Sequence, residues 1–228
     1  MKTTGGSDEE KRAAGESAAE AVEDGTVVGL GTGSTAVHAI RALGRRVDSG
    51  LDVRGIPTSF QSRELATGVG VPLTSLDRVE QIDLAIDGAD QFSGPHLVKG
   101  GGGAHAREKI VDAAADRLLV VADPSKFAKQ LDHPVPVEVL PDARTTAADE
   151  IRALGATPTL RTAERKDGPV VTDNGNLLLD CEFGPVPNPA ELAGDLAEIP
   201  GTVEHGLFVG MADEVHVGSE DDVEIKRF

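Results

Sequence analysis

The first segment that could do chemistry consists of glycines and residues with hydroxyl side chains, Gly31-Thr32-Gly33-Ser34-Thr35. Glycines after a strand let backbone N–H groups turn toward an anion, and the next helix N-terminus adds positive potential. The segment therefore predicts a phosphate-binding loop made by Thr32, Gly33, Ser34 and Thr35. No Lys follows the glycines, so it is not a P-loop. A dinucleotide is a minor alternative, because the next apolar run ends in Pro57-Thr58-Ser59 without the acid that would hold a ribose.

Two carboxylates come next, in Asp87-Gly88-Ala89-Asp90. Carboxylates at the end of a strand can orient sugar hydroxyls or act as acid and base. A metal site is a competing interpretation, although no His or further carboxylate stands nearby at ligand spacing. A chance pair also remains open, because Asp is abundant in this chain.

A third segment contains Lys99 and the glycines Gly100 to Gly103. Four successive glycines cost more backbone entropy than a simple turn requires, so we expect the backbone to approach a ligand here. Lys99 offers a charge for a phosphate or a developing oxyanion. Glu108, early in the next predicted helix, is either a base or a side chain that favours the helix dipole. Lys126 follows another predicted strand, and the six histidines lack the spacing of zinc ligands.

Alternating strands and helices position these residues. Such alternation predicts a parallel sheet with helices on both faces, and ligands bind such sheets at the carboxyl ends of the strands, where all of these segments fall. Ser7 is the expected N-cap of the first helix. We predict strands at Thr26–Leu30, Val53–Ile56, Ile82–Ile86 and Leu118–Ala122, and helices at Ala36–Leu43, Phe60–Thr67 and Ala104–Ala115.

The pattern changes near His133 and predicts a smaller α+β lobe. We expect an α/β fold with a Rossmann-like main domain, residues 1–132 with 207–228, and a lobe at 133–206 inserted near the C-terminus. Two apolar runs within Gly206–Val217 would return to the main sheet. In the lobe we predict a strand at Pro134–Pro141, helices at Ala143–Leu154 and Pro189–Ala197, and a hairpin of Val170–Thr172 with Leu177–Leu179 around Asp173-Asn174-Gly175-Asn176.

The amino-acid composition limits the classes of molecule that this chain is expected to bind. The formal net charge is −17, from 39 acidic and 22 basic residues, so nucleic acid and anionic membranes are poor partners. An evenly acidic surface suits concentrated salt. Cys181, the only cysteine, is expected to be an inert buried thiol. Without an apparent signal peptide or membrane-spanning run, the cytoplasm is the expected compartment.

Six motifs in this order resemble the A type of ribose-5-phosphate isomerase. Their order and spacing match from about Asp8 to the C-terminus, which makes the set specific although each motif is weak alone. The motifs are Gly29 to Ala36, Asp87 to Asp90, Lys99 to Gly102 with Arg107-Glu108-Lys109, Ala122 to Lys126, Thr172 to Asn176, and Ile199 to Gly201.

The resemblance implies a sugar phosphate substrate, a homodimer or dimer of dimers, and an enediol mechanism that uses neither metal nor cofactor. It implies that Glu108 is the catalytic base and that Lys126, with Lys11 less securely, lies near the phosphate. The family usually has Glu where this chain has Gln91, so a carboxylate role there is in doubt. The substrate loops are Thr32, Gly33, Ser34 and Thr35; then Asp87, Gly88, Ala89 and Asp90; then Lys99, Gly100, Gly101 and Gly102.

Two other classes of protein are alternatives. A non-catalytic sugar-phosphate sensor would use the same pocket, but it would need a partner module, and the chain has no basic segment to serve as one. An amino-sugar phosphate deaminase or a CoA transferase of related fold would use a further acid–base group or a nucleophilic Glu.

Overall fold

The computed structural model describes residues 5–165, 167–220 and 222–228, which form two compact units. The parallel-sheet unit contains residues 5–89, Arg107–Lys126 and Met211–Phe228. The antiparallel unit contains Asp90–Ala106 and Phe127–Gly210. The domain division made from the sequence, at residues 132 and 206, stays a prediction.

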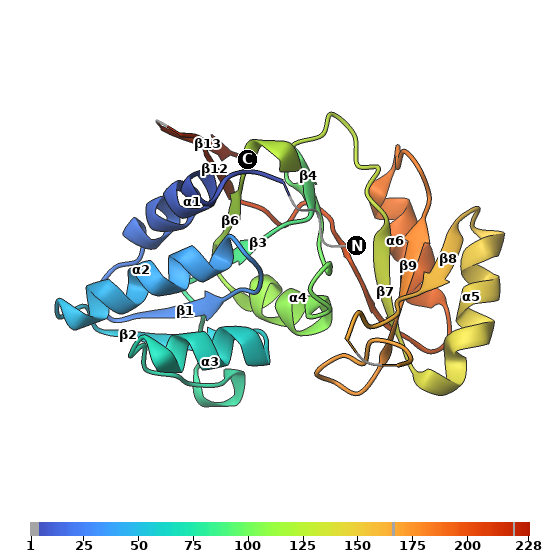
Figure 1. The fold of residues 1–228 in the computed structure, drawn as a ribbon, viewed down its shortest axis with the longest axis horizontal. Coiled ribbons are helices and arrows are strands. Elements are labelled where there is room, and N and C mark those ends of the chain that lie inside the picture. Colours follow the sequence, from blue (N-terminus) through green and yellow to red (C-terminus); the bar gives the residue numbers. More distant parts are fainter. Residues whose placement is uncertain (1–4, 166, 221) are drawn as a thin grey trace. The chain divides into compact units, whose positions relative to one another are not determined.

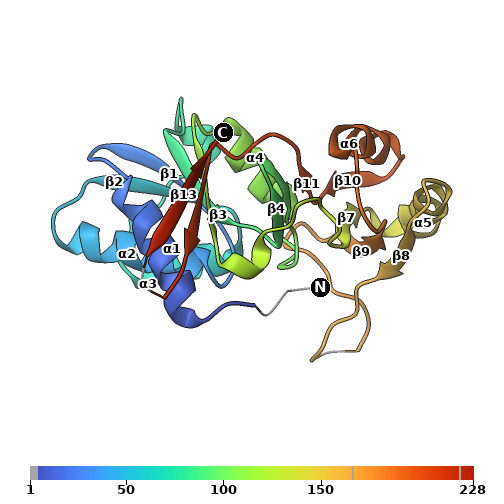
Figure 2. The same cartoon turned by 90° about the horizontal axis from the view of Figure 1, so that it is seen from above.

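The parallel-sheet unit has a six-stranded sheet in the order β13-β12-β6-β3-β1-β2 (Figure 1). Five strands of this sheet pair in parallel, and the sixth, β13, pairs antiparallel with β12 at one edge (Figure 2). This arrangement confirms the predicted α/β class. The strands are β1 (Thr26–Leu30), β2 (Val53–Pro57), β3 (Leu84–Gly88), β6 (Leu118–Ala122), β12 (Glu214–Gly218) and β13 (Val223–Arg227).

Helices cover both faces of this sheet. Val28 of β1 packs in a buried cluster with residues of the first two helices, whereas Val27 packs against Val111 of the fourth. Successive residues of a strand point to opposite faces, so β1 alone holds helices on both sides. The helices are α1 (Asp8–Glu20), α2 (Ala36–Asp48), α3 (Phe60–Gly68) and α4 (His105–Ala114), with short 3-10 turns at Leu76–Arg78 and Pro124–Lys126.

The start of α1 is capped as the sequence predicts. The Glu10 N–H donates to Ser7 Oγ at 3.1 Å, and the Ser7 N–H donates to Glu10 Oε2 at 2.7 Å. This capping box satisfies two backbone donors that have no partner within the helix. The predicted N-cap at Ser7 is therefore confirmed.

The antiparallel unit contains a four-stranded sheet, β10-β7-β9-β8, and a three-stranded sheet, β11-β5-β4. Valines of β7 pack with Ile151 of α5 and Leu196 of α6 in a separate buried core. The elements are β4 (Gln91–Ser93), β5 (His96–Val98), β7 (Val135–Val139), a 3-10 turn at Pro141–Ala143, α5 (Arg144–Ala153), β8 (Thr157–Leu160), β9 (Leu177–Glu182), α6 (Pro189–Glu198), β10 (Thr202–His205) and β11 (Leu207–Phe208).

The predicted hairpin is correct in its turn but wrong in its partner strand. The Thr172 N–H donates to Asn176 O at 2.9 Å, but Val171 forms only an isolated bridge with Leu177. β9 pairs with β7 and β8 instead. Buried Glu138 of β7 holds the turn, since its Oε1 accepts hydrogen bonds from Thr172, Asn174 and Asn176.

Three other predictions about the strands need correction. β3 begins at Leu84 rather than Ile82 and includes Asp87. The glycine loop follows β5, an antiparallel strand of the small sheet, and not a strand of the parallel sheet. Of the two apolar runs in Gly206–Val217, only β12 joins the parallel sheet, while β11 pairs with β5. Periodicity identifies a strand but not its pairing partner.

Candidate active site

Asp87 ties together two predicted substrate loops in the parallel-sheet unit. Its Oδ1 accepts hydrogen bonds from the Thr32 N–H at 3.0 Å and from the Gly88 N–H at 2.7 Å. β1 and β3 are neighbours in the sheet, so the loops that follow them meet at one edge. Asp87 is 1% exposed, which makes this a buried carboxylate at the end of a strand. The structure thus brings Thr32 and Asp87 together, as the sequence led us to expect.

Two glycines shape the loop after β1. A Cβ at Gly31 would lie 2.2 Å from the Asp87 carboxyl carbon, so no larger residue fits beside that carboxylate. Gly33 has a φ of +122°, a conformation that L side chains rarely adopt. Ser34 is exposed, and Thr35 is the N-cap of α2, whose first turn begins here. The loop therefore exposes Ser34 directly before the N-terminus of α2.

Thr58 and Ser59 join this loop, although the sequence interpretation gave them no role. Thr32 Oγ1 lies 2.9 Å from Thr58 Oγ1 and donates to Ser59 Oγ at 2.7 Å. Thr58 is fully buried and donates to Leu30 O at 3.0 Å. Their position directly after β2 was the available signal, because β2 neighbours β1 in a parallel sheet. The Thr32 hydroxyl is held in one orientation by these partners.

Lys126 lies in the 3-10 turn after β6 and is 6% exposed. Its N–H donates to the carbonyl of Asp123, whose own carboxylate accepts hydrogen bonds from Ser125. Lys11, on α1, donates from Nζ to Gly6 O at 3.3 Å. A Cβ at Gly6 would lie 2.4 Å from the Asp123 side chain, so the segment bonded to Lys11 packs on the turn that contains Lys126.

Glu108 lies in the first turn of α4 and is only 4% exposed. A Glu that merely complements the helix dipole would lie in solvent. Asp112, one turn later and therefore on the same face, is 3% exposed. The sequence interpretation missed Asp112, although its spacing of four residues from Glu108 was a usable signal. This face of α4 carries two buried carboxylates.

Asp90 and the glycine loop meet in the antiparallel unit. The Gly101 N–H donates to Asp90 Oδ2 at 2.6 Å, and a Cβ at Gly101 would lie 2.4 Å from Asp90 Oδ1. Gly100 has a φ of +104° and would place a Cβ 2.7 Å from His105 Nδ1. Gly100 is therefore required by its backbone conformation and its close contact, whereas a Cβ at Gly101 would displace the end of the Asp90 side chain. Gly102 is the exposed member of the loop.

Lys99 is 2% exposed at the start of this loop. Its N–H donates to Gly206 O at 2.8 Å, and its Nζ lies 5.2 Å from the centroid of the Phe208 ring. An ammonium at this distance from an aromatic face gains electrostatic attraction. A Cβ at Gly206 would lie 2.2 Å from Lys99 O, so this close backbone approach requires glycine.

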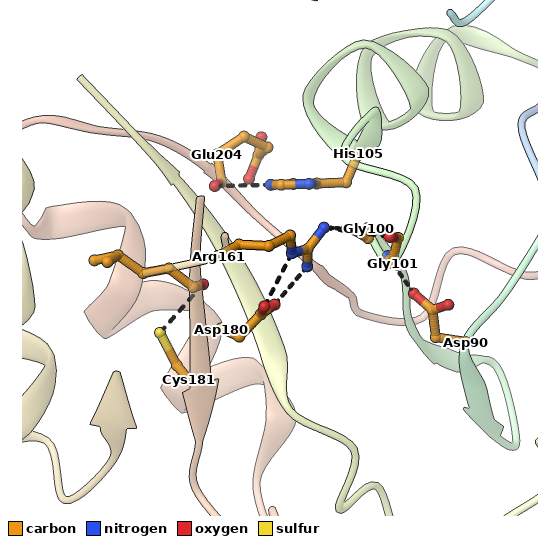
Figure 3. A network of polar contacts seen from close by, with 9 residues as sticks. Asp90, Gly100, Gly101, His105, Arg161, Asp180, Cys181 and Glu204 are labelled. Carbon is orange, nitrogen blue, oxygen red and sulfur yellow. Dashed lines mark hydrogen bonds and ion pairs between the residues drawn. The ribbon is translucent and has the colours of Figure 1, made fainter. Parts of the chain in front are cut away.

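Arg161 is the main polar residue that sequence reasoning missed. Its Nη1 donates to Gly100 O at 2.9 Å and to Gly101 O at 3.2 Å (Figure 3). Its Nε donates to Asp180 Oδ2 at 2.9 Å, and its Nη2 donates to Asp180 Oδ1. A lone Asp in the apolar run of β9 was the only sequence signal for this ion pair.

The surroundings of Asp180 and Cys181 set their protonation. Burial raises the pKa of the Asp180 carboxyl, whereas the hydrogen bond and positive charge of Arg161 are the largest causes that lower it, and the pKa lies below its ordinary value. Burial, with the neighbouring Asp180 charge, raises the pKa of the Cys181 thiol to about 12. The predicted burial of the thiol is confirmed.

Gln91 makes contacts that a carboxylate could not reproduce. Its Nε2 donates to Asp132 Oδ1 at 2.6 Å, and its Oε1 accepts from the N–H groups of Asp132 and His133 at 2.8 and 3.0 Å. A Glu here would accept the two N–H bonds but would face the Asp132 carboxylate without a donor. The amide thus matches its surroundings in the antiparallel unit.

The predicted site residues are divided between the two units. Among the residues that the structure describes, no set of three or more His, Cys, Asp or Glu side chains is arranged to hold a metal ion. No helix among those residues is long and apolar enough to cross a membrane. The parallel-sheet unit holds Thr32, Gly33, Ser34, Thr35, Asp87, Gly88, Ala89, Glu108, Lys126 and Lys11, and the antiparallel unit holds Asp90, Lys99, Gly100, Gly101 and Gly102.

Known proteins resemble this chain over nearly its whole length. A ribose-5-phosphate isomerase A from Haloarcula marismortui is 68% identical over 222 residues, which are 97% of each chain. One from Natronomonas pharaonis is 62% identical and covers 99% of this chain and 100% of the relative.

Solved structures agree. Ribose 5-phosphate isomerase A from Methanocaldococcus jannaschii superposes with a TM-score of 0.92 at 42% identity, covering 96% of this chain and 98% of that one. A D-ribose-5-phosphate isomerase in complex with phospho-erythronic acid gives 0.95 at 38% identity, covering 98% and 100%. The family model of ribose 5-phosphate isomerase A (phosphoriboisomerase A) matches residues 54–222. With this match, the near-complete relatives and the same fold, the chain belongs to the ribose 5-phosphate isomerase A family.

Proposed function

We propose that this chain interconverts D-ribose 5-phosphate and D-ribulose 5-phosphate through an enediol, without a metal ion. Membership of the family, with 68% identity to a relative of that name, is the observation that carries the proposal. The relative solved with phospho-erythronic acid supports a sugar acid phosphate as a ligand for this fold. The reaction moves one proton between C1 and C2 of the opened sugar.

Glu108 is the proposed base that abstracts and returns this proton. Its burial on the first turn of α4 supports the role, because a base shielded from water keeps the proton for return to the substrate. A positioned base contributes roughly 10²–10⁴-fold to the rate. One carboxylate serves both directions, since C1 and C2 share one face of the planar enediol.

The proposed donors to the oxygen on which charge develops are Lys99 and the glycine N–H groups other than those of Gly101 and Gly103, which donate to Asp90 and to Gly100 O. The burial of Lys99 supports this, because a charge acts more strongly where water is excluded. Asp87 and Asp90 are proposed to orient the sugar hydroxyls and assist ring opening. Each already accepts a backbone N–H from its own unit, which restricts the side chain to one position.

The phosphate is proposed to bind at Thr32–Thr35, with Lys126 and Lys11. The N-terminus of α2 supports this, because its backbone donors and dipole favour an anion. The contact of Lys11 with Gly6, next to the turn of Lys126, supports bringing both cations to one place. These two cations would attract the phosphate at short range, although the overall charge of −17 repels it at long range.

The test is an assay for ribulose 5-phosphate formed from ribose 5-phosphate, with and without EDTA. We expect isomerisation at an unchanged kcat in the chelator. Activity lost in EDTA and restored by a divalent ion would contradict the metal-free scheme, and an inactive wild-type protein would contradict the function.

Molar KCl should lower the KM for ribose 5-phosphate. Salt at this concentration shortens the Debye length to about 3 Å and so removes the long-range repulsion between the acidic chain and the phosphate.

We also propose a homodimer or a dimer of dimers that works in the cytoplasm. The family resemblance supports the assembly, and a single buried cysteine supports a compartment in which disulfides are rare. Light scattering during size-exclusion chromatography should give a mass of two or four copies of the 23.6 kDa chain. A mass of 23.6 kDa in molar KCl would contradict the assembly.

A further inference from the structure

We propose that Arg161 is a positioning residue for the isomerisation, one that orients the peptide groups of the glycine loop. The proposal rests on the proposed function, and it gives Arg161 a role beyond packing. The guanidinium of Arg161 joins three groups: the carbonyls of Gly100 and Gly101, and the carboxylate of Asp180 (Figure 3). All of them belong to the antiparallel unit.

The two carbonyl contacts determine where the loop N–H groups point. No cis peptide bond occurs among the described residues, and in a trans peptide the N–H points away from the preceding carbonyl. The peptide between Gly100 and Gly101 is held at both ends, by Arg161 at its carbonyl and by Asp90 at its N–H. The Gly101 carbonyl also faces Arg161, so the Gly102 N–H is aimed in the opposite direction.

Glycines make such a clamp necessary. Within the loop, the Gly103 N–H donates to Gly100 O at 2.9 Å, but each glycine samples more backbone conformations than other residues, so this one bond leaves the Gly101 carbonyl to partners outside the loop. Gly100 and Gly103 have φ values of +104° and +76°, which only the surroundings select. Donors act on a developing charge only if they are oriented before it appears.

The chemistry of Arg161 suits this role better than that of Lys would. A guanidinium offers five N–H donors in a fixed plane, so it can bind a carboxylate with two nitrogens and still reach carbonyls. The side chains of Arg161 and Asp180 are 12% and 19% exposed, so their geometry is shielded from water. A Lys ammonium has its three donors on one nitrogen, so it would not span Asp180 and both carbonyls.

The experiment compares Arg161→Ala and Arg161→Lys with wild type and with Arg152→Ala. Arg152 is a matched control, because it pairs with Asp149 on the exposed surface of α5 in the same unit. We expect kcat to fall roughly 10²-fold in both Arg161 variants, as a displaced loop predicts, with KM within about threefold of wild type. Added guanidinium should restore part of kcat in Arg161→Ala only.

Amide NMR of isotopically labelled protein provides a readout that does not depend on turnover. The Gly101 and Gly102 amide signals should shift in Arg161→Ala and move back when guanidinium is added. A folded Arg161→Lys with kcat within twofold of wild type, or unshifted glycine amides in Arg161→Ala, would overturn the proposal. A wild-type protein without isomerase activity would instead refute the function, and the amide shifts would still decide the role of Arg161.

Discussion

The loop after β1 and the glycine loop at Lys99–Gly103 are both anchored by a carboxylate, but they differ in what else holds them. Asp87 accepts two N–H groups from strand ends that are neighbours in one parallel sheet. Asp90 accepts one N–H of the glycine loop, and the carbonyl of Gly100 in that loop accepts a hydrogen bond from Arg161. Arg161 in turn donates to the carboxylate of Asp180. Both loops connect a strand to a helix, but four successive glycines lose more backbone entropy on ordering and need anchors on both polar edges of the backbone.

The largest effect is expected at Glu108, the proposed base, rather than at either anchor. Glu108→Gln keeps the size and most hydrogen bonding of the side chain but removes the base. We expect kcat to fall by roughly 10²-fold or more while substrate still binds. Deuterium exchange at C2 of ribose 5-phosphate in D₂O should disappear in parallel. Near-normal turnover of Glu108→Gln would contradict this assignment and would point to Asp87 or Asp90 as the base.

Alanine at one glycine of each loop tests the difference in anchoring directly. A Cβ at Gly31 would lie 2.5 Å from the Asp87 Cα, a backbone atom that cannot move aside. We expect Gly31→Ala to cost about 1–3 kcal/mol of unfolding free energy. A Cβ at Gly101 meets only the end of the Asp90 side chain, so Gly101→Ala should lower kcat with a smaller loss of stability.

Urea unfolding measures these stabilities, with Gly194→Ala as the control. A Cβ at Gly194 meets no atom within 4 Å, and the residue lies inside α6. Gly194→Ala should therefore raise stability by roughly 0.5–1 kcal/mol. Equal losses for Gly31→Ala and Gly101→Ala would show that the two loops are held alike.

Asp180 makes the anchoring of the glycine loop depend on pH. Its folded pKa lies below the ordinary value of 3.8, so its stabilising contribution is present at neutral pH. That contribution is lost as pH falls through 3.8 and then through the lowered folded value. Asp180→Asn should be less stable than wild type at pH 7, with a gap that narrows toward about pH 3. Urea titrations at both pH values would contradict this if the gap stayed constant.

The smallest effect is expected at Gln91, which binds outside both loops. Gln91→Glu places a second carboxylate against Asp132, so we expect a loss of about 0.5–1 kcal/mol at low salt and less in molar KCl. The double variant with Asp132→Asn should recover most of the loss. We expect kcat to stay within about twofold, because the side chain is tied to residues 132 and 133. A gain in kcat of more than twofold in Gln91→Glu would contradict this prediction and would indicate that a carboxylate at this position takes part in catalysis.

Much of the parallel-sheet unit was predictable from local patterns. β1 and β6 have the predicted bounds, and Ser7 caps α1 as expected. Such signals lie within a few residues, because apolar periodicity and caps depend on the immediate neighbours. Asp87 and Thr32 also follow from the sequence, since parallel strands bring their carboxyl ends to one edge.

Only the tertiary structure decided how the antiparallel unit holds its loop. Arg161 contacts Gly100 across 61 positions, and nothing between them in the chain marks the pair. β5 and β11 also pair across more than 100 residues, which moved the glycine loop to a different sheet from the predicted one. The sequence by itself determined the bounds of β1 and β6 and the cap of α1. The long-range partners of these elements depend on how separate elements pack, because a hydrogen bond between distant residues leaves no periodic trace in either segment.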